Sequence, residues 1–236
     1  MESISLVARK QCDALWQQSF RHPLVQGIKN GTLPLEQFRF YIKQDAYYVR
    51  EFAKLHGMVA AQSDDADVVA TLLKIGLGLA EGELQLHQKL FQTLEISEQE
   101  WKTFQPAPDA YGYISHLYHV VSKGSLGHSL AALMPCPWLY YEIGLQLKDA
   151  QPKEQIYREW IIEYSGEGIE KNMEIERALW DETSRWASDE ERREMIHIFM
   201  QSSYYEYRFW EMAARLKDWP TYGQGEQTYD RKSAVD

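Results

Sequence analysis

Hydrophobic residues recur at helical spacing through nearly the whole chain, and this periodicity is the feature that most constrains its fold. Apolar positions repeat three and four residues apart, whereas no segment alternates with the two-residue period of a half-buried strand. The sequence therefore predicts an all-α protein. The segments predicted to be helical are residues 5–20, 35–62, 66–95, 109–123, 126–149, 154–163, 167–186 and 189–217.

The connections between these segments predict that the chain forms one domain. The connections are short, and no Gly/Ser-rich or charged linker divides the 236 residues. Hydrophobic residues make up 44% of the chain, which is enough for a single large core. We therefore predict a single-domain helical bundle over residues 1–218. Residues 219–236 mix polar residues with proline and glycine, so we predict a loosely ordered C-terminal tail there.

Charge and cysteine content exclude several classes of partner. The formal net charge is −10 and the basic residues are scattered, so nucleic acid is not an expected partner. No apolar run is long enough for a membrane span and no leader is visible, which predicts a cytoplasmic protein with no membrane partner. With only Cys12 and Cys136 present, neither a disulfide framework nor a thiolate-rich metal site is expected.

The tripeptide Pro135-Cys136-Pro137 interrupts an apolar helical segment with a thiol at its centre. Each proline lacks the N–H that a helix interior needs, and the residue before Pro137 is disfavoured in helical dihedrals. We therefore expect a break in the helix there, with Cys136 outside helical geometry. A free cysteine is often a buried structural residue, so its neighbours decide between a structural and a chemical role.

Two predicted helices carry a carboxylate in the middle of their apolar face. At about 100° per residue, Asp45 falls within roughly 60° of Tyr48 and Phe52, and Glu206 within roughly 60° of Phe209. Both carboxylates are therefore predicted to point inward. Burial disfavours the charged form of a carboxyl group and raises its pKa, which suits proton transfer near neutral pH. Alternatively, each could simply satisfy a polar pocket in the core.

Tyrosines are spread over several predicted helices. Aromatic rings around a few convergent polar groups make a pocket suited to a flat ligand with polar edges, although many of these rings must also be ordinary core. They are Tyr47, Tyr48, Tyr111, Tyr113, Tyr140, Tyr141, Tyr164, Tyr204 and Tyr205.

A metal site is the main competing chemistry. Glu83 and His87 form an i, i+4 pair, Glu81 lies close to them in sequence, and Glu142 follows the Pro-Cys-Pro segment. The set is incomplete, because a di-iron bundle needs a further histidine-bearing motif on another helix. We therefore predict no metal ligands. His56 continues the Asp45 face at helical spacing and is the one other histidine that could act on a thiol.

Several strings in the chain resemble the TenA family, also called thiaminase II or aminopyrimidine aminohydrolase. The similarity covers most of the length, and two of the strings contain the inward-facing carboxylates. The strings are HPLVQGI (22–28), NGTLP (30–34), FYIKQDAYY (40–48), AYGY (110–113), PC (135–136), WLYYE (138–142) and SSYYEYRFW (202–210).

The resemblance implies a haem-oxygenase-like helical fold that binds no haem, usually as a homotetramer. It also implies hydrolysis at the carbon attached to the 5-position of a 4-amino-2-methylpyrimidine, with no metal or organic cofactor. The implied substrates are 4-amino-5-aminomethyl-2-methylpyrimidine and, more slowly, thiamin. The product would be the hydroxymethylpyrimidine, for thiamin salvage. Residues 1–218 would then be the catalytic domain.

The resemblance also implies roles for individual residues. Cys136 would be the nucleophile that adds to the pyrimidine ring, which places the chain in the Cys-containing class of the family. Glu206 would protonate a ring nitrogen, and Asp45 would bind the 4-amino edge and help hold the thiol. The residues implied to line the pyrimidine pocket are Tyr48, Tyr113, Tyr140, Tyr164 and Phe209.

Two departures from the family pattern stand out. Pro137 follows the cysteine where a larger residue is expected, and the residues just after Tyr164 lack an aromatic that relatives tend to place there. Two alternatives stay open beside the hydrolase: a non-catalytic binder or regulator that uses the same pocket, and a metal-dependent oxidase on the same fold. The intact Cys136, Glu206 and Asp45 set disfavours the first, and the missing histidine ligands disfavour the second.

Overall fold

The computed structural model describes residues 2–220, except for the side chains of residues 83–85. These described residues form helices with no β-strand among them, which confirms the predicted all-α class. In chain order the elements are α1 (Ile4–Gln11), α2 (Asp13–Phe20), α3 (Pro23–Asn30), α4 (Leu35–Ala60), α5 (Ala66–Gly78), the π-helix η1 (Leu79–Glu83), α6 (Leu84–Thr93), α7 (Glu98–Lys102), α8 (Pro108–Lys123), α9 (Leu126–Leu133), α10 (Pro135–Leu147), α11 (Gln155–Tyr164), α12 (Glu167–Thr183) and α13 (Asp189–Ala214).

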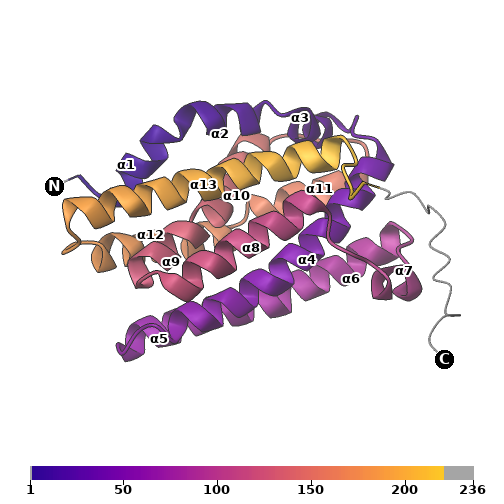
Figure 1. Cartoon of the computed structure of the whole chain (residues 1–236). Helices are drawn as coiled ribbons and strands as arrows, with labels where there is room; N and C mark the ends of the chain where they lie inside the picture. Colours follow the sequence, from indigo (N-terminus) through magenta and orange to yellow (C-terminus); the bar gives the residue numbers. More distant parts are fainter. Residues whose placement is uncertain (1, 221–236) are drawn as a thin grey trace, which may run out of the picture.

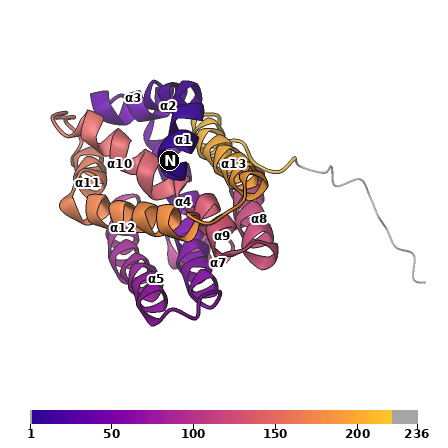
Figure 2. The same cartoon turned by 90° about the vertical axis from the view of Figure 1, so that its left-hand side faces the viewer.

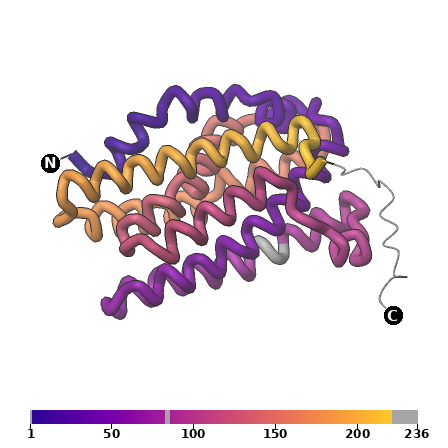
Figure 3. The backbone as a smooth tube through the Cα atoms, viewed as in Figure 1, coloured from indigo at the N-terminus to yellow at the C-terminus, as the bar shows by residue number. Residues whose placement is uncertain are grey.

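The two longest helices, α4 and α13, extend along the length of the molecule (Figure 1 and Figure 3). α4 packs against α5, α8 and α13, while α13 also packs against α1, α2 and α9. Seen from the end, α12 lies between α10 and α5, and α1 to α3 cover the opposite side of the bundle (Figure 2). The largest fully buried side chains of this core include the indoles of Trp16, Trp160, Trp180 and Trp210.

Local sequence signals explain where many helices begin. At the start of α13, the Ser188 hydroxyl accepts a hydrogen bond from the Glu191 N–H, and the Glu191 carboxylate accepts one from the Ser188 N–H at 2.8 Å. This reciprocal pair satisfies two N–H groups that have no partner within the helix. At the start of α5, Asp65 accepts hydrogen bonds from the N–H groups of Asp67 and Val68. α4 begins directly after Pro34, as its sequence predicts.

Three predicted helices are divided in the structure. Residues 5–20 form α1 and α2, which meet at Cys12, and residues 66–95 form α5, η1 and α6. The third, 126–149, divides into α9 and α10 at Met134. At Cys12 the N–H already bonds the carbonyls of Ala8 and Arg9. Such changes of direction keep the same apolar spacing on both sides, so periodicity alone does not reveal them.

Helix α3 was not among the predicted segments. Pro23 occupies its first turn, the His22 imidazole Nδ1 accepts a hydrogen bond from the Leu24 N–H at 3.2 Å, and Gly31 ends it with a φ of 67°. Proline at the first position and glycine just past the end are recognised helix boundary signals. The helix is short, with eight residues, and it gives a weak periodic signal.

The Pro-Cys-Pro segment divides the helix as predicted, but the expected position of Cys136 outside helical geometry is wrong. α9 ends at Leu133, and Pro135, Cys136 and Pro137 form the first turn of α10. Met134 between the two helices keeps right-handed helical dihedrals, with φ −59° and ψ −35°. Prolines are tolerated in a first turn because the N–H groups there have no intrahelical partner. The thiol is therefore held on a helix.

Gly144 lets α10 approach the end of α11 closely. A Cβ atom at this position would lie 1.8 Å from the carbonyl oxygen of Tyr164, so we expect Gly144→Ala to push the two helices apart. The expected loss in the free energy of unfolding is about 1–3 kcal/mol, the range of overpacked cores, measured by urea denaturation. Gly57→Ala is the control, because a Cβ at Gly57 meets nothing within 4 Å. A stable Gly144→Ala variant would contradict the packing.

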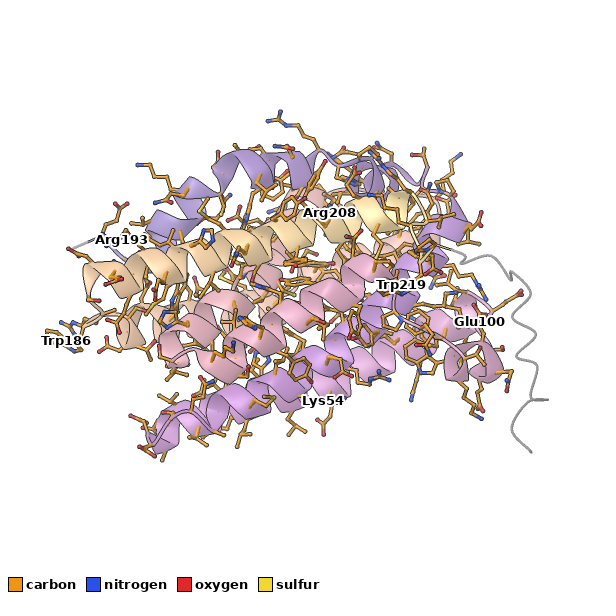
Figure 4. All side chains as sticks on the ribbon, in the orientation of Figure 1. Lys54, Glu100, Trp186, Arg193, Arg208 and Trp219 are labelled. Carbon is orange, nitrogen blue, oxygen red and sulfur yellow. The ribbon has the colours of Figure 1, made fainter. Side chains whose placement is uncertain are left out.

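No described helix has the length and hydrophobicity that a bilayer span requires. Of the predicted tail, residues 221–236 lie outside the described residues. Trp219, labelled in Figure 4, donates a hydrogen bond from its indole N–H to the Pro106 carbonyl at 2.9 Å. The start of the predicted tail is thus attached to the connection that precedes α8.

Candidate active site

A cavity of about 390 Å³ lies among α4, α5, η1 and α10 to α13. Seven of the eight residues that the sequence analysis assigned to the site line it, and they come from four helices. These are Asp45 and Tyr48 of α4, Cys136 and Tyr140 of α10, Tyr164 of α11, and Glu206 and Phe209 of α13. The eighth, Tyr113 of α8, does not line the cavity. It is buried and donates a hydrogen bond to Glu206, which does line it.

The Cys136 thiol and the Glu206 carboxyl group lie together in this cavity. They are hydrogen-bonded, and the contact with the thiol favours the charged form of Glu206. Tyr113 donates a second hydrogen bond to Glu206 Oε1 at 2.7 Å. Burial nevertheless dominates and raises the pKa of Glu206 to about 8. At neutral pH this group is therefore protonated, and it can both give up and take back a proton.

Asp45 is the second buried carboxylate, and the predicted inward orientation of both acids is confirmed. Asp45 is 4% exposed and Glu206 is 2% exposed. The imidazole Nε2 of His87, on α6, lies 3.1 Å from Asp45 Oδ2. This contact orients the carboxylate at the wall of the cavity. Sequence reasoning considered His87 only as a metal ligand and missed this pairing.

Aromatic rings enclose the two acids and the thiol. The Tyr48 ring lies 5.0 Å from that of Tyr113 and 5.9 Å from that of Phe209, and Tyr140 lies 4.6 Å from Tyr164, all between centroids. Burial raises the pKa of Tyr48, Tyr113 and Tyr140 well above that of a free phenol, so these hydroxyls stay neutral. The buried Tyr48 hydroxyl interacts with that of Tyr113, and this contact also raises the pKa of Tyr48.

The residues considered for a metal site do not gather. Glu142 is held by Arg9, with Nε–Oε1 and Nη2–Oε2 distances of 3.0 and 2.6 Å. His87 contacts Asp45, Glu81 is exposed, and the Glu83 side chain lies outside the described residues. Within the described residues, no group of three or more His, Cys, Asp or Glu side chains has an arrangement that could hold a metal ion.

Comparison with known proteins identifies the family. A model of the TENA/THI-4/PQQC family matches residues 9–216. The chain belongs to this family. It is 43% identical over 204 residues to a Bacillus subtilis (strain 168) protein named aminopyrimidine aminohydrolase, and the match covers 86% of each chain.

Solved structures of TenA proteins share the architecture. A TenA homologue protein from P. horikoshii OT3 superposes with a TM-score of 0.83 at 27% identity, covering 90% of this chain and 99% of that one. A domain from Shewanella denitrificans described as having a haem oxygenase-like fold superposes with a TM-score of 0.67 at 13% identity, covering 90% of both chains. The fold expected from the resemblance, a single-domain haem-oxygenase-like bundle, is confirmed.

One further buried pair in this TenA-family chain escaped the sequence analysis. His56 is fully buried and does not line the cavity, but its Nε2 lies 3.6 Å from Oε1 of Glu176, which does line it. Glu176 sits on α12, which is generally polar. The helical face of Met173, Glu176 and Trp180 could have indicated burial, since two of its three members are apolar.

Proposed function

We propose that this chain is an aminopyrimidine aminohydrolase of the Cys-containing class. It hydrolyses 4-amino-5-aminomethyl-2-methylpyrimidine, and thiamin more slowly, to 4-amino-5-hydroxymethyl-2-methylpyrimidine for thiamin salvage. The observation that carries the proposal is the hydrogen-bonded Cys136–Glu206 pair, with a Glu206 pKa of about 8, inside an aromatic cavity. The relative of the same name, 43% identical over most of both chains, supports the assignment.

In the proposed mechanism, Glu206 first donates a proton and then accepts another. Protonated Glu206 gives its proton to a ring nitrogen of the pyrimidine, which makes the ring electrophilic. As the Cys136 sulfur bonds to a ring carbon, the thiol proton passes to the Glu206 carboxylate with which it shares a hydrogen bond. The dearomatised ring then expels ammonia or the thiazole from its exocyclic methylene. Water adds to that methylene and releases a proton to the ammonia or to solvent. The sulfur then departs as a thiolate, and the proton on the ring nitrogen returns to it through Glu206, which restores the aromatic ring and the thiol.

The other site residues bind and orient the ring. Asp45, fixed by His87 at 3.1 Å, accepts hydrogen bonds from the 4-amino edge and helps to hold the thiol. Tyr48 and Tyr140 contact the ring by stacking or hydrogen bonding. The Tyr140 hydroxyl also lies 3.1 Å from that of Tyr41. Tyr164 and Phe209 complete the pyrimidine pocket by packing, and Tyr113 holds Glu206 through its hydrogen bond.

The assembly and setting of the enzyme follow the family resemblance. We propose that residues 1–218 form the catalytic domain and that the protein acts as a cytoplasmic homotetramer. The proposed reaction requires a small-molecule pyrimidine as its only partner and uses no metal or organic cofactor.

Ammonia release tests this function directly. Protein dialysed against a chelator and supplied with the aminomethyl pyrimidine is expected to form ammonia and the hydroxymethyl product in equal amounts. Activity that disappears on chelation and returns with a transition metal would favour the oxidase alternative. Tight pyrimidine binding with no ammonia formed would favour the non-catalytic binder.

A further inference from the structure

The cavity continues beyond the proposed pyrimidine pocket along α4. Helices rise about 1.5 Å per residue, so Phe52 lies about 10 Å further along the axis than Asp45. The residues that line this outer chamber come from α4, α5, η1 and α12. We define it by the lining residues Val49, Phe52, Ile75, Leu79, Asn172 and Glu176.

The substituent on the pyrimidine must occupy this chamber. The inner end of the cavity is closed by the buried residues Asp45, Tyr140 and Phe209, whereas exposed residues such as Ile162 and Asn172 border its outer part. A leaving group has to depart while the ring is still attached to Cys136. Its route out therefore passes through the outer chamber.

Glu176 is the buried acid of the outer chamber. It is 2% exposed, and His56 Nε2 lies 3.6 Å from its Oε1. The Nδ1–H of His56 donates to the Phe52 carbonyl at 2.9 Å, since a carbonyl can only accept. Burial opposes protonation of His56, but the contacts with Glu176 and the Phe52 carbonyl together outweigh it, so the pKa of His56 is raised. The histidine thus positions the Glu176 carboxyl group at the wall of the chamber.

The charge of the whole cavity favours a cation. Besides the protonated Glu206, three carboxyl groups line it, from Asp45, Glu163 and Glu176, and no lysine or arginine is among the described lining residues. A concave site of one sign concentrates ligands of the opposite sign. The thiazolium of thiamin is permanently positive, and the amine of the aminomethyl pyrimidine is protonated at neutral pH.

We propose that Glu176, held in place by His56, binds the positively charged leaving group of the substrate in the outer chamber. This inference rests on the proposed function, which defines what the leaving group is. Glu176 is then a residue that determines substrate preference, and His56 is its positioning residue. Pyrimidines with a charged substituent are retained in preference to those with a neutral one.

The expected effect is on binding rather than on the chemical step. When the C–N bond breaks, its electron pair stays with the nitrogen, so the leaving group loses its positive charge. Glu176 therefore stabilises the bound substrate at least as well as the transition state, and such contacts lower KM without raising kcat. A purely structural His56–Glu176 pair would instead affect protein stability and treat all ligands alike.

Ligand binding without turnover tests the proposal. In a Cys136→Ser background, Glu176→Gln is expected to weaken thiamin binding by about tenfold or more, as loss of a charged hydrogen-bond partner does. Binding of the neutral hydroxymethyl pyrimidine should change less than about twofold, because its ring contacts are intact. Isothermal titration calorimetry measures both. Glu174→Gln, an exposed position of the same helix, is the matched control and should change neither.

A second variant distinguishes loss of the carboxylate charge from loss of the fold. Glu176→Asp keeps the charge, so it should bind thiamin better than Glu176→Gln does, with thermal unfolding recorded for both. Equal losses for thiamin and the neutral pyrimidine, or no loss for either, would overturn the role of Glu176. Failure of the unsubstituted Cys136→Ser protein to bind the neutral pyrimidine would instead contradict the pyrimidine pocket, and with it the proposed function.

Discussion

Replacing Cys136 by serine is expected to lower the rate of aminopyrimidine hydrolysis by at least about a thousandfold, the scale seen when an enzyme loses its nucleophile. A serine hydroxyl has a far higher pKa than a thiol and is a poorer nucleophile toward a ring carbon. The serine hydroxyl can still form the hydrogen bond to Glu206, because a hydroxyl can also donate to a carboxyl group. Steady-state ammonia release and product formation measure the loss, while pyrimidine binding should persist.

Cys12 provides the matched control for this substitution. It is 3% exposed at the junction of α1 and α2, and burial raises the pKa of its thiol. Cys12→Ser should therefore keep the wild-type rate constant, with at most a small cost in stability. If Cys136→Ser stayed fully active, or if Cys12→Ser abolished activity in a folded protein, the assignment of the nucleophile would be wrong.

Much of the fold could be predicted because the apolar spacing of long helices depends on the sequence alone. The spans of α4, α8, α11 and α13 agree with prediction within a few residues. The division of 66–95 by the π-helix could not be predicted, because the glycines there permit several backbone paths and packing selects one. The helical conformation of Cys136 could not be predicted either, because it depends on how α9 and α10 pack where they meet.

Within the site, the two inward-facing acids could be found because each interrupts a long apolar face. Their partners could not be found in the same way. His87 lies 42 residues from Asp45 in the chain, and Glu176 lies far beyond His56, so only the tertiary packing of α6 and α12 against α4 brings each pair together. Such pairings determine the electrostatics of the cavity.

Substituting Glu206 by glutamine is the second change expected to remove most of the activity. The amide keeps the size of the side chain and can still accept a hydrogen bond from Tyr113, but it cannot transfer a proton. We expect turnover to fall by about 10²- to 10⁴-fold, the range for loss of a general acid, while the pyrimidine remains bound. Unchanged turnover would eliminate the acid/base role of Glu206.

The pH dependence separates this role from a structural one. The wild-type reaction starts with protonated Glu206, so kcat/KM should fall as pH rises through about 8. The residual activity of Glu206→Gln should lack that decline. A Tyr113→Phe variant, which removes one hydrogen bond to the charged form of Glu206, should move the decline to higher pH. A decline that stays in place in Glu206→Gln would assign it to another group.

Stability should respond to pH through the same group, with a definite sign. The pKa of Glu206 is about 8 in the folded chain, against 4.5 for an unperturbed glutamate. Between these values the folded state keeps a proton that the unfolded state has released, so the free energy of unfolding falls as pH rises. The loss from Glu206 is about 1.4 kcal/mol per pH unit.

Glutamine cannot ionise, so the Glu206→Gln variant should gain stability relative to wild type from about pH 6 to pH 8, measured by urea denaturation. A constant difference across that range would mean that Glu206 is not protonated in the folded enzyme, and the proton relay through Cys136 would lose its source.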